Sequence, residues 1–102
     1  MFKELREEFM GVGEVKNHRF CLDHRNDHAY IYVVELMSPD LIEVLSRHYE
    51  VFERRVNSLY GCVRYPRSKA FGVWAFTYRE CERDLALKKF YELTDRVIKK
   101  SN

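Results

Sequence analysis

The sequence predicts an α+β domain in which an antiparallel sheet of about four strands carries a C-terminal helix on one face. Two runs rich in β-branched and aromatic residues, 28–36 and 71–78, are typical of strands. The residues after 78 instead have a helical period of apolar side chains. Strands grouped before a helix favour α+β over alternating βαβ units, and a length of 102 residues predicts that 1–102 is a single globular domain.

The first residues of the chain have the pattern of a short N-terminal amphipathic helix. Phe2, Leu5 and Phe9 recur at i, i+3 and i+7, which places them on one helical face. Gly11 follows this run and is a residue type that commonly ends helices. We therefore expect a helix from about residue 2 to residue 11.

A β-hairpin is predicted next. Residues 15–22 read as a strand, residues 23–27 are polar and turn-forming, and residues 28–36 form the strongest strand pattern of the chain. Two strands that are joined by a short polar turn are expected to pair antiparallel.

The segment 41–56 is ambiguous between helix and strand. Ser38, Pro39 and Asp40 are typical of a helix start, with a capping hydroxyl, a proline and an early acid. The bulky residues of 48–53 suit a pleated surface. We favour a short helix or turn at 39–46 followed by a strand from about 48 to 56, and the all-helical alternative stays open.

The remaining elements follow from turn residues and periodicity. Residues 57–61 form a connection, 62–65 a short strand that ends at Pro66, and 71–78 a second clear strand. Thr77 and Glu80 have the spacing of a capping box, which predicts a final helix that runs to about Lys99. Its buried face is expected to consist of Ala86, Phe90, Leu93 and Val97.

Composition predicts a cytoplasmic protein without a membrane segment. The longest apolar run, 30–34, is far shorter than the roughly 20 residues of a membrane-spanning helix. Five of the six residues at positions 3–8 are charged, where a secretory signal would be apolar. Three widely spaced cysteines, an odd number, favour reduced thiols over a disulfide framework.

No constellation of residues points to catalysis or to a bound metal. Cys21, His24 and His28 have spacing compatible with zinc, but regular strand alternation would put Cys21 on the face opposite His24. No motif links Cys62 or Cys81 to a histidine base, and no nucleophile elbow is present. We therefore expect a protein that is not an enzyme and has no catalytic residue, metal or cofactor.

The distribution of charge supplies the best functional hypothesis. The net charge is only +2, yet every residue from Arg54 to Arg79 is basic or uncharged. Basic side chains neutralise phosphates and aromatic rings stack on bases, so this tract predicts a binding module for single-stranded nucleic acid. The candidate binding residues are Arg54, Arg55, Arg64, Tyr65, Arg67, Lys69 and Trp74.

Two observations support a different interpretation of the same tract. Alternate aromatic residues of a strand normally point into the core, where they cannot stack on a ligand, and the arginines have acidic partners elsewhere in the chain. The sequence pI of about 8.5 is also below the value above 9 that is typical of nucleic-acid-binding domains. The alternative is a protein-interaction or self-assembling accessory protein, in which a homo-oligomer forms and the aromatic residues are mostly core.

Overall fold

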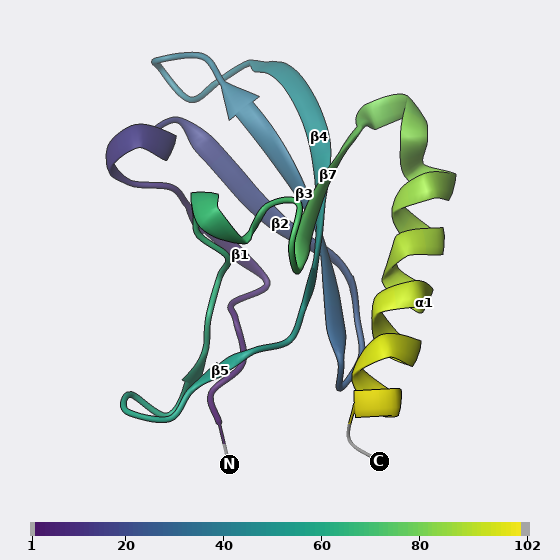
Figure 1. Ribbon diagram of the computed structural model, residues 1–102. Helices are drawn as coiled ribbons and strands as arrows, with labels where there is room; N and C mark the ends of the chain where they lie inside the picture. Colours follow the sequence, from purple (N-terminus) through teal and green to yellow (C-terminus); the bar gives the residue numbers. More distant parts are fainter. Residues whose placement is uncertain (1, 101–102) are drawn as a thin grey trace.

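The protein is built on one five-stranded antiparallel sheet with the strand order β1-β2-β3-β4-β7. In this computed structural model, residues 2–100 are described, apart from the side chains of 97, 99 and 100 (Figure 1). The sheet strands are β1 (Glu8–Met10), β2 (His18–Arg25), β3 (Ala29–Met37), β4 (Val44–Glu53) and β7 (Ala75–Arg79).

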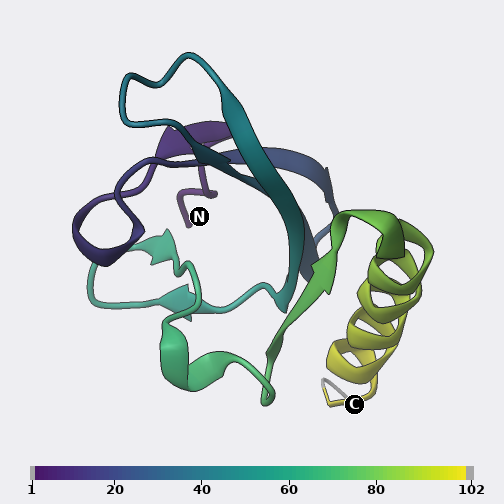
Figure 2. The same ribbon diagram turned by 90° about the horizontal axis from the view of Figure 1, so that it is seen from above.

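The chain leaves the sheet after β4 and returns to it at β7. This excursion, residues 54–74, contains the two-stranded pair of β5 (Val56–Asn57) and β6 (Cys62–Val63) and the 3-10 turn η2 (Ser68–Ala70). The sheet is curled, and the excursion lies on its inner side while the helix lies outside (Figure 2). The excursion, which closes the inner face, therefore makes up most of the acid-free tract 54–79, and β7 makes up the rest.

Helical structure is concentrated at the C-terminus. The 3-10 turn η3 (Glu80–Glu82) leads into α1 (Arg83–Lys100), and a further 3-10 turn, η1 (Gly13–Val15), precedes β2. Within residues 2–100, no helix is long and apolar enough to cross a membrane. The prediction of an antiparallel sheet with a C-terminal helix on one face is confirmed.

Strand β3 contributes to a core on each face of the sheet. Its alternating side chains send Tyr30 and Tyr32 to the inner face and Ala29 and Ile31 to the outer face, and all four are at most 1% exposed. Because both faces are covered, the strand reads as a nearly continuous apolar run rather than as a polar and apolar alternation.

The inner core is dominated by aromatic rings. The ring of Phe9 stacks on that of Phe20 with centroids 4.8 Å apart, and Tyr65 meets Phe52 edge-on at the same separation. Offset and edge-on contacts of this kind stabilise beyond the area that the rings bury. The excursion completes this core with Val63, Ala70 and Trp74.

The outer core joins α1 to the sheet. Ala86, Phe90 and Leu93 are at most 1% exposed and pack with Ile31 and Val51. Their spacing of four and three residues places them on one face of the helix, as the sequence predicted. Val97, the fourth predicted member, has a side chain outside the described part of the structure.

The predicted N-terminal helix is wrong. Lys3 instead forms a bridge with Cys62, and Glu8–Met10 pairs with β2 as strand β1. A helix of ten residues is marginal in water without tertiary support. Pairing with the sheet edge gives backbone N–H and C=O groups of β1 hydrogen-bond partners on β2. It also stacks the ring of Phe9 on that of Phe20, so the extended conformation is favoured.

The helix-start signal at 38–40 serves a tight turn instead. The carboxylate of Asp40 accepts a hydrogen bond from the backbone N–H of Ile42 (3.1 Å), and the Ser38 hydroxyl accepts one from Glu43 (3.1 Å). Leu41 has a φ of 63°, which is incompatible with helix continuation. The favoured interpretation of a turn followed by a strand is confirmed, but the strand begins earlier, at Val44, and ends at Glu53.

The start of the last strand and the N-terminal cap of the helical segment that follows it differ in position from the prediction. Residues 72–74 form a turn, so β7 begins only at Ala75. The Glu82 carboxylate, rather than that of Glu80, accepts a hydrogen bond from the backbone N–H of Arg79 (2.8 Å). The cap therefore lies two residues later than expected, because β7 continues past Thr77.

A buried carboxylate ties three strands together. Glu35 is 6% exposed, and its cross-strand neighbours are Arg19 on β2 and Arg47 on β4. The two Nε atoms lie 2.8 Å and 2.6 Å from separate oxygens of the carboxylate. Burial acts to raise the pKa of Glu35, but the bonds from Arg47 and Arg19 outweigh it and lower that pKa below its usual value.

The helix packing can be tested with two identical substitutions. Leu93→Ala is expected to lower the free energy of unfolding by about 2–5 kcal/mol, because it removes a side chain that is 1% exposed. Leu85→Ala, on the same helix but 49% exposed, is expected to cost less than about 1 kcal/mol. Urea denaturation measures both, and equal losses would contradict the assignment of the buried helix face.

The Glu35 network predicts a pH dependence. Glu35→Gln is expected to lower the free energy of unfolding at pH 7 by about 1–3 kcal/mol, since both guanidinium groups lose their counter-charge. Because the folded-state pKa is lowered from 4.5, this stabilisation is complete above pH 4.5 and is lost as pH falls through the folded-state pKa. The difference between wild type and variant should therefore shrink in acid. Urea denaturation at pH 7 and pH 3 measures it, and an unchanged difference would count against the network.

Candidate functional site

The excursion encloses a cavity of about 900 Å³, here called the basic hollow. Its walls come from β5, the segment after β6, η2 and the turn before β7. Asn57, Ser68, Ala70 and Val73 contribute polar and small apolar surface. The other lining residues, which carry its charge and its rings, are Arg55, Arg64, Tyr65, Arg67, Lys69 and Trp74.

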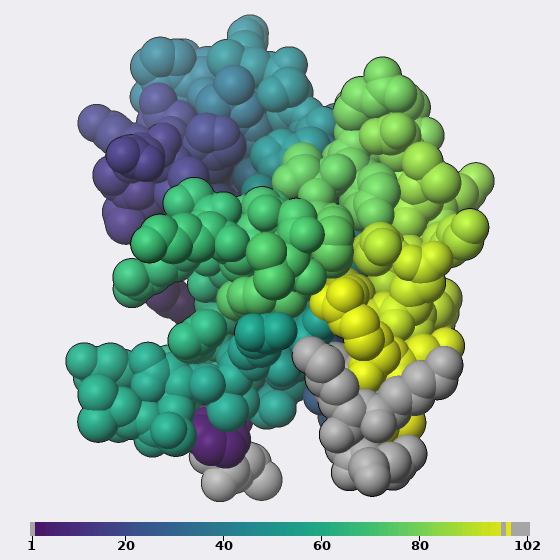
Figure 3. Space-filling model, viewed as in Figure 1, coloured from purple at the N-terminus to yellow at the C-terminus, as the bar shows by residue number. Residues whose placement is uncertain are grey.

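The basic hollow has cations without counter-charges. None of its lining residues is acidic. Among the described residues, Arg64, Arg67 and Lys69 form no ion pair, whereas Arg55 lies 3.3 Å from Glu53 Oε1. In Figure 3 the 55–64 segment projects at the lower left, beneath the green surface of the residues around η2. Three unpaired cations around one hollow make a site that favours an anion.

Trp74 lies beneath two of the arginines that line the basic hollow. Its side chain is 7% exposed, and the guanidinium carbons of Arg55 and Arg64 lie 4.7 Å and 5.8 Å from the ring centroid. Cation–π contacts at these distances hold the two arginines in place. The buried ring therefore contacts the protein's own cations.

Tyr65 belongs to the core as well as to the hollow. Its ring contacts Phe9, Phe20 and Phe52 edge-on, and its hydroxyl donates a hydrogen bond to Glu50 Oε1 (2.5 Å). Burial and the adjacent carboxylate raise the pKa of Tyr65 well above its usual value. The hydroxyl thus remains a donor at neutral pH and fixes the wall of the hollow.

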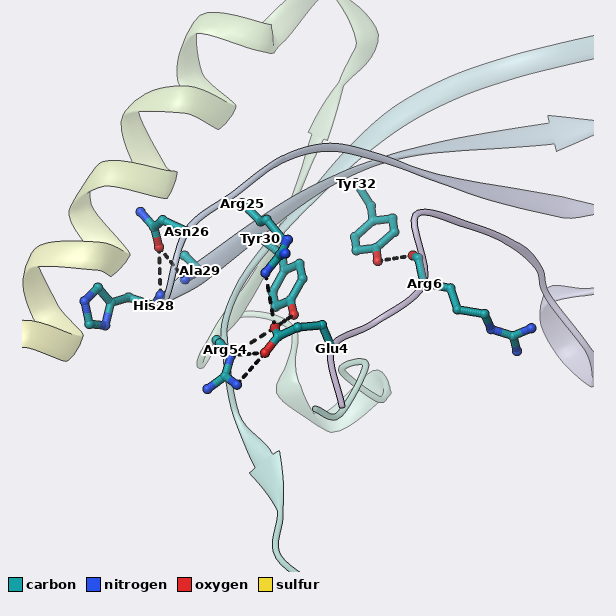
Figure 4. A network of polar contacts seen from close by, with 9 residues as sticks. All are labelled: Glu4, Arg6, Arg25, Asn26, His28, Ala29, Tyr30, Tyr32 and Arg54. Atoms are coloured by element: carbon teal, nitrogen blue, oxygen red, sulfur yellow. Dashed lines mark hydrogen bonds and ion pairs between the residues drawn. The ribbon is translucent and has the colours of Figure 1, made fainter. Parts of the chain in front are cut away.

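Arg54 is the one predicted binding residue that lies elsewhere. Its Nη2 is 2.6 Å from Glu4 Oε2, and Glu4 also accepts a hydrogen bond from the Tyr30 hydroxyl (Figure 4). The hydrogen bond from Arg54 lowers the pKa of Glu4. Arg54 therefore ties the N-terminal segment to the sheet and does not line the hollow.

The turn after β5 exposes an aromatic ring that the predicted binding residues do not include. Tyr60 is 76% exposed and Leu59 is 80% exposed, in the turn between β5 and β6, whereas neither is among the residues predicted to bind. Their place in the sequence Asn57-Ser58-Leu59-Tyr60-Gly61 was the available signal, because bulky apolar residues at the tip of a tight turn have no core to enter.

The spacing of Cys21, His24 and His28 does not produce a metal centre among residues 2–100, where no group of three or more suitable side chains is found. A β-bulge between Leu22 and His24 breaks the alternation assumed from the sequence. The His24 ring consequently packs against Phe90 of α1, with centroids 5.0 Å apart. The sequence argument that placed His24 on the other face of the sheet is therefore wrong.

The covered indole predicts a fluorescence result, because Trp74 is the single tryptophan. Acrylamide is expected to quench the folded protein much more weakly than the urea-unfolded chain, since the ring is 7% exposed. Arg55→Ala should increase quenching by uncovering one ring face, while Arg6→Ala, at an exposed site outside the hollow, should not. Equal quenching in the folded and unfolded states would refute the geometry.

Comparison of the chain with models of protein families, with curated proteins and with solved structures finds no match. A functional assignment therefore has to start from the geometry and charge of the basic hollow.

Proposed function

We propose that this protein is a non-catalytic binding module that takes the phosphates of a single-stranded nucleic acid into the basic hollow. The observation that carries the proposal is the set of three cations, Arg64, Arg67 and Lys69, that line one cavity and make no ion pair among the described residues. Phosphate groups provide the negative charge that such a cluster attracts.

The electrostatic repulsion among the clustered cations supports a negatively charged ligand. Like charges that share a small space repel one another, and no carboxylate stands among the lining residues that the structure describes. Arg64 is held over Trp74 and so presents its guanidinium group in a fixed place. A preorganised cation loses less freedom on binding than a mobile one, which favours capture of phosphate.

An exposed aromatic ring supplies a stacking surface. Trp74 is covered, but Tyr60 stands exposed in the turn after β5, and Asn57 at the end of β5 lines the hollow. Base stacking on an aromatic side chain is tolerant of sequence because every base has a π face. We assign this role to Tyr60, with the cations of the hollow holding the backbone.

A protein partner is the second candidate. The loop between β3 and β4 and the start of β4 expose apolar side chains, with Ile42 78% and Leu45 57% exposed. Exposed apolar residues that lie close in sequence are typical of interaction surfaces. A complex formed there, including a homo-oligomer, would depend weakly on salt, in contrast to phosphate binding.

The compartment that we propose is the cytoplasm. Cys21, Cys62 and Cys81 are free thiols. Reduced cysteines suit a compartment in which glutathione and thioredoxin keep thiols reduced.

A salt titration tests the phosphate proposal. Binding of a single-stranded oligonucleotide, followed by anisotropy of a label on the oligonucleotide, should weaken steeply between about 50 and 200 mM salt. The variant with Arg64, Arg67 and Lys69 changed to Ala should bind more weakly. Its plot of log K against log salt should be less steep by about 2, because each phosphate contact with a single strand contributes roughly 0.7.

A matched control separates the hollow from net charge. Arg6, Arg83 and Lys88 are exposed and lie outside the hollow, so changing all three to Ala removes the same charge elsewhere. This control should retain the salt slope and most of the affinity. No binding at low salt, or equal losses in the two triple variants, would overturn the assignment of the hollow.

A further inference from the structure

A second cavity, here called the apolar groove, lies on the other side of the segment 65–68. It has a volume of about 640 Å³ and lies between the loop of η1 and the segment that contains η2. Figure 1 shows η1 in purple and η2 in green on the same side of the sheet. Its apolar walls include the flat side chains of Phe20, Pro66 and Phe71.

The polar lining of the groove includes a carboxylate on the sheet. Glu50 on β4 and its cross-strand neighbour Thr77 on β7 both line the groove. Glu50 Oε1 accepts the Tyr65 hydroxyl bond, and Oε2 lies 2.9 Å from Nε2 of His48. Only 14% of the Glu50 side chain is exposed, so its carboxylate is held in position by these partners. Each carboxylate oxygen has a second lone pair with which to accept a ligand hydrogen bond.

The groove and the basic hollow are neighbours with opposite character. Tyr65, Arg67 and Ser68 line both cavities, so a single stretch of chain separates them. The described lining of the hollow has cations and no acid, whereas the groove has flat apolar walls and the carboxylates of Glu14 and Glu50, with Arg67 at the border between the two. One ligand that enters both cavities must carry negative charge at one end and a flat group with hydrogen-bond donors at the other.

This pairing excludes the simpler occupants. A fatty acid could place its carboxylate in the hollow, but its alkyl chain in the groove has no hydrogen-bond donor for the Glu50 carboxylate. A basic peptide would meet the cations of the neighbouring hollow. A nucleotide satisfies both cavities, because its phosphate is anionic and its base is flat and edged with polar groups. Single-stranded bases are commonly read in this way, between flat side chains and through the base edge.

We propose that the apolar groove is a nucleobase pocket in which Glu50 accepts a hydrogen bond from an exocyclic amino group, so that amino-bearing bases such as cytosine are preferred over uracil. The proposal rests on the proposed function, because the strand that enters the groove is the one whose phosphates lie in the basic hollow. Uracil places a carbonyl oxygen where cytosine has its amino group, and that oxygen would face the carboxylate.

Two oligonucleotides of equal length provide a sensitive test, one of deoxycytidine and one of deoxyuridine. Their backbones are the same, and their bases have the same ring and differ at the amino or carbonyl group that the groove is proposed to distinguish. At one salt concentration, the wild-type protein is expected to bind the cytosine strand at least about fivefold more tightly. Equal affinities of the wild-type protein for the two strands would contradict the base pocket but not the proposed phosphate binding. The measurement uses only the wild-type protein, so it does not depend on whether a variant folds.

The substitution Glu50→Gln identifies the reading group. A glutamine amide both donates and accepts hydrogen bonds, so the ratio of the two affinities should fall towards one. The matched control is Glu7→Gln, which removes the same charge from an exposed residue outside both cavities and should keep the ratio. An unchanged ratio in the Glu50 variant, or the same loss of the ratio in both variants, would overturn the role of Glu50.

The two levels of the proposal fail differently. If neither strand binds at low salt, the proposed function fails and the base pocket fails with it. If both strands bind equally and with steep salt dependence, the hollow stands and the base pocket is wrong. Changing Arg64, Arg67 and Lys69 to Ala should lower the affinity for both oligonucleotides by the same factor, because phosphate contacts do not distinguish one base from another.

Discussion

The burial of β3 on both faces is the constraint on which the rest of the structure depends. Its alternating side chains face two cores, so the sheet is stable only when each face is covered. The helix α1 covers the outer face, and the excursion between β4 and β7 covers the inner one. The inner residues of β3 include two tyrosines, whose hydroxyls need polar partners. The N-terminal segment provides them, because Glu4 and the carbonyl of Arg6 accept their hydrogen bonds.

The requirement that the excursion cover the inner face of the sheet determines which of its residues form the candidate site. The excursion carries Val63, Ala70 and Trp74 into the inner core, and Arg64 and the residues 67–69 between them are left at the surface. Several of those residues are basic and none is acidic. Meanwhile Glu4, Glu35 and Glu53 are paired with arginines in the described structure. Among the described residues, Arg64, Arg67 and Lys69 therefore have no ion-pair partner. Glu53 pairs with Arg55 of the hollow, and Glu4 and Glu35 pair with arginines outside it.

Much of the architecture follows from local patterns. The β2–β3 hairpin and the final helix were predictable because their apolar residues, turn residues and helical period are all visible over short stretches. The bounds of the first strand were not, since β2 begins at His18 rather than Val15 and continues through Arg25 into the predicted turn. The N-terminal segment was not, since Phe2, Leu5 and Phe9 fit a helical face while the edge of the sheet offered a better arrangement. The residues 38–40 likewise carry capping chemistry that serves a turn as well as a helix.

The sequence by itself determined that one tract is free of acids and that six basic residues lie within or at the ends of it. Only the tertiary structure decided which of them share a space, because ion pairs such as Arg54 with Glu4 join residues fifty positions apart. Tertiary packing likewise placed Trp74 beneath Arg55 and Arg64 and brought Glu50 to an adjacent groove. Composition fixes the available charges, but long-range folding contacts decide which of them remain unpaired.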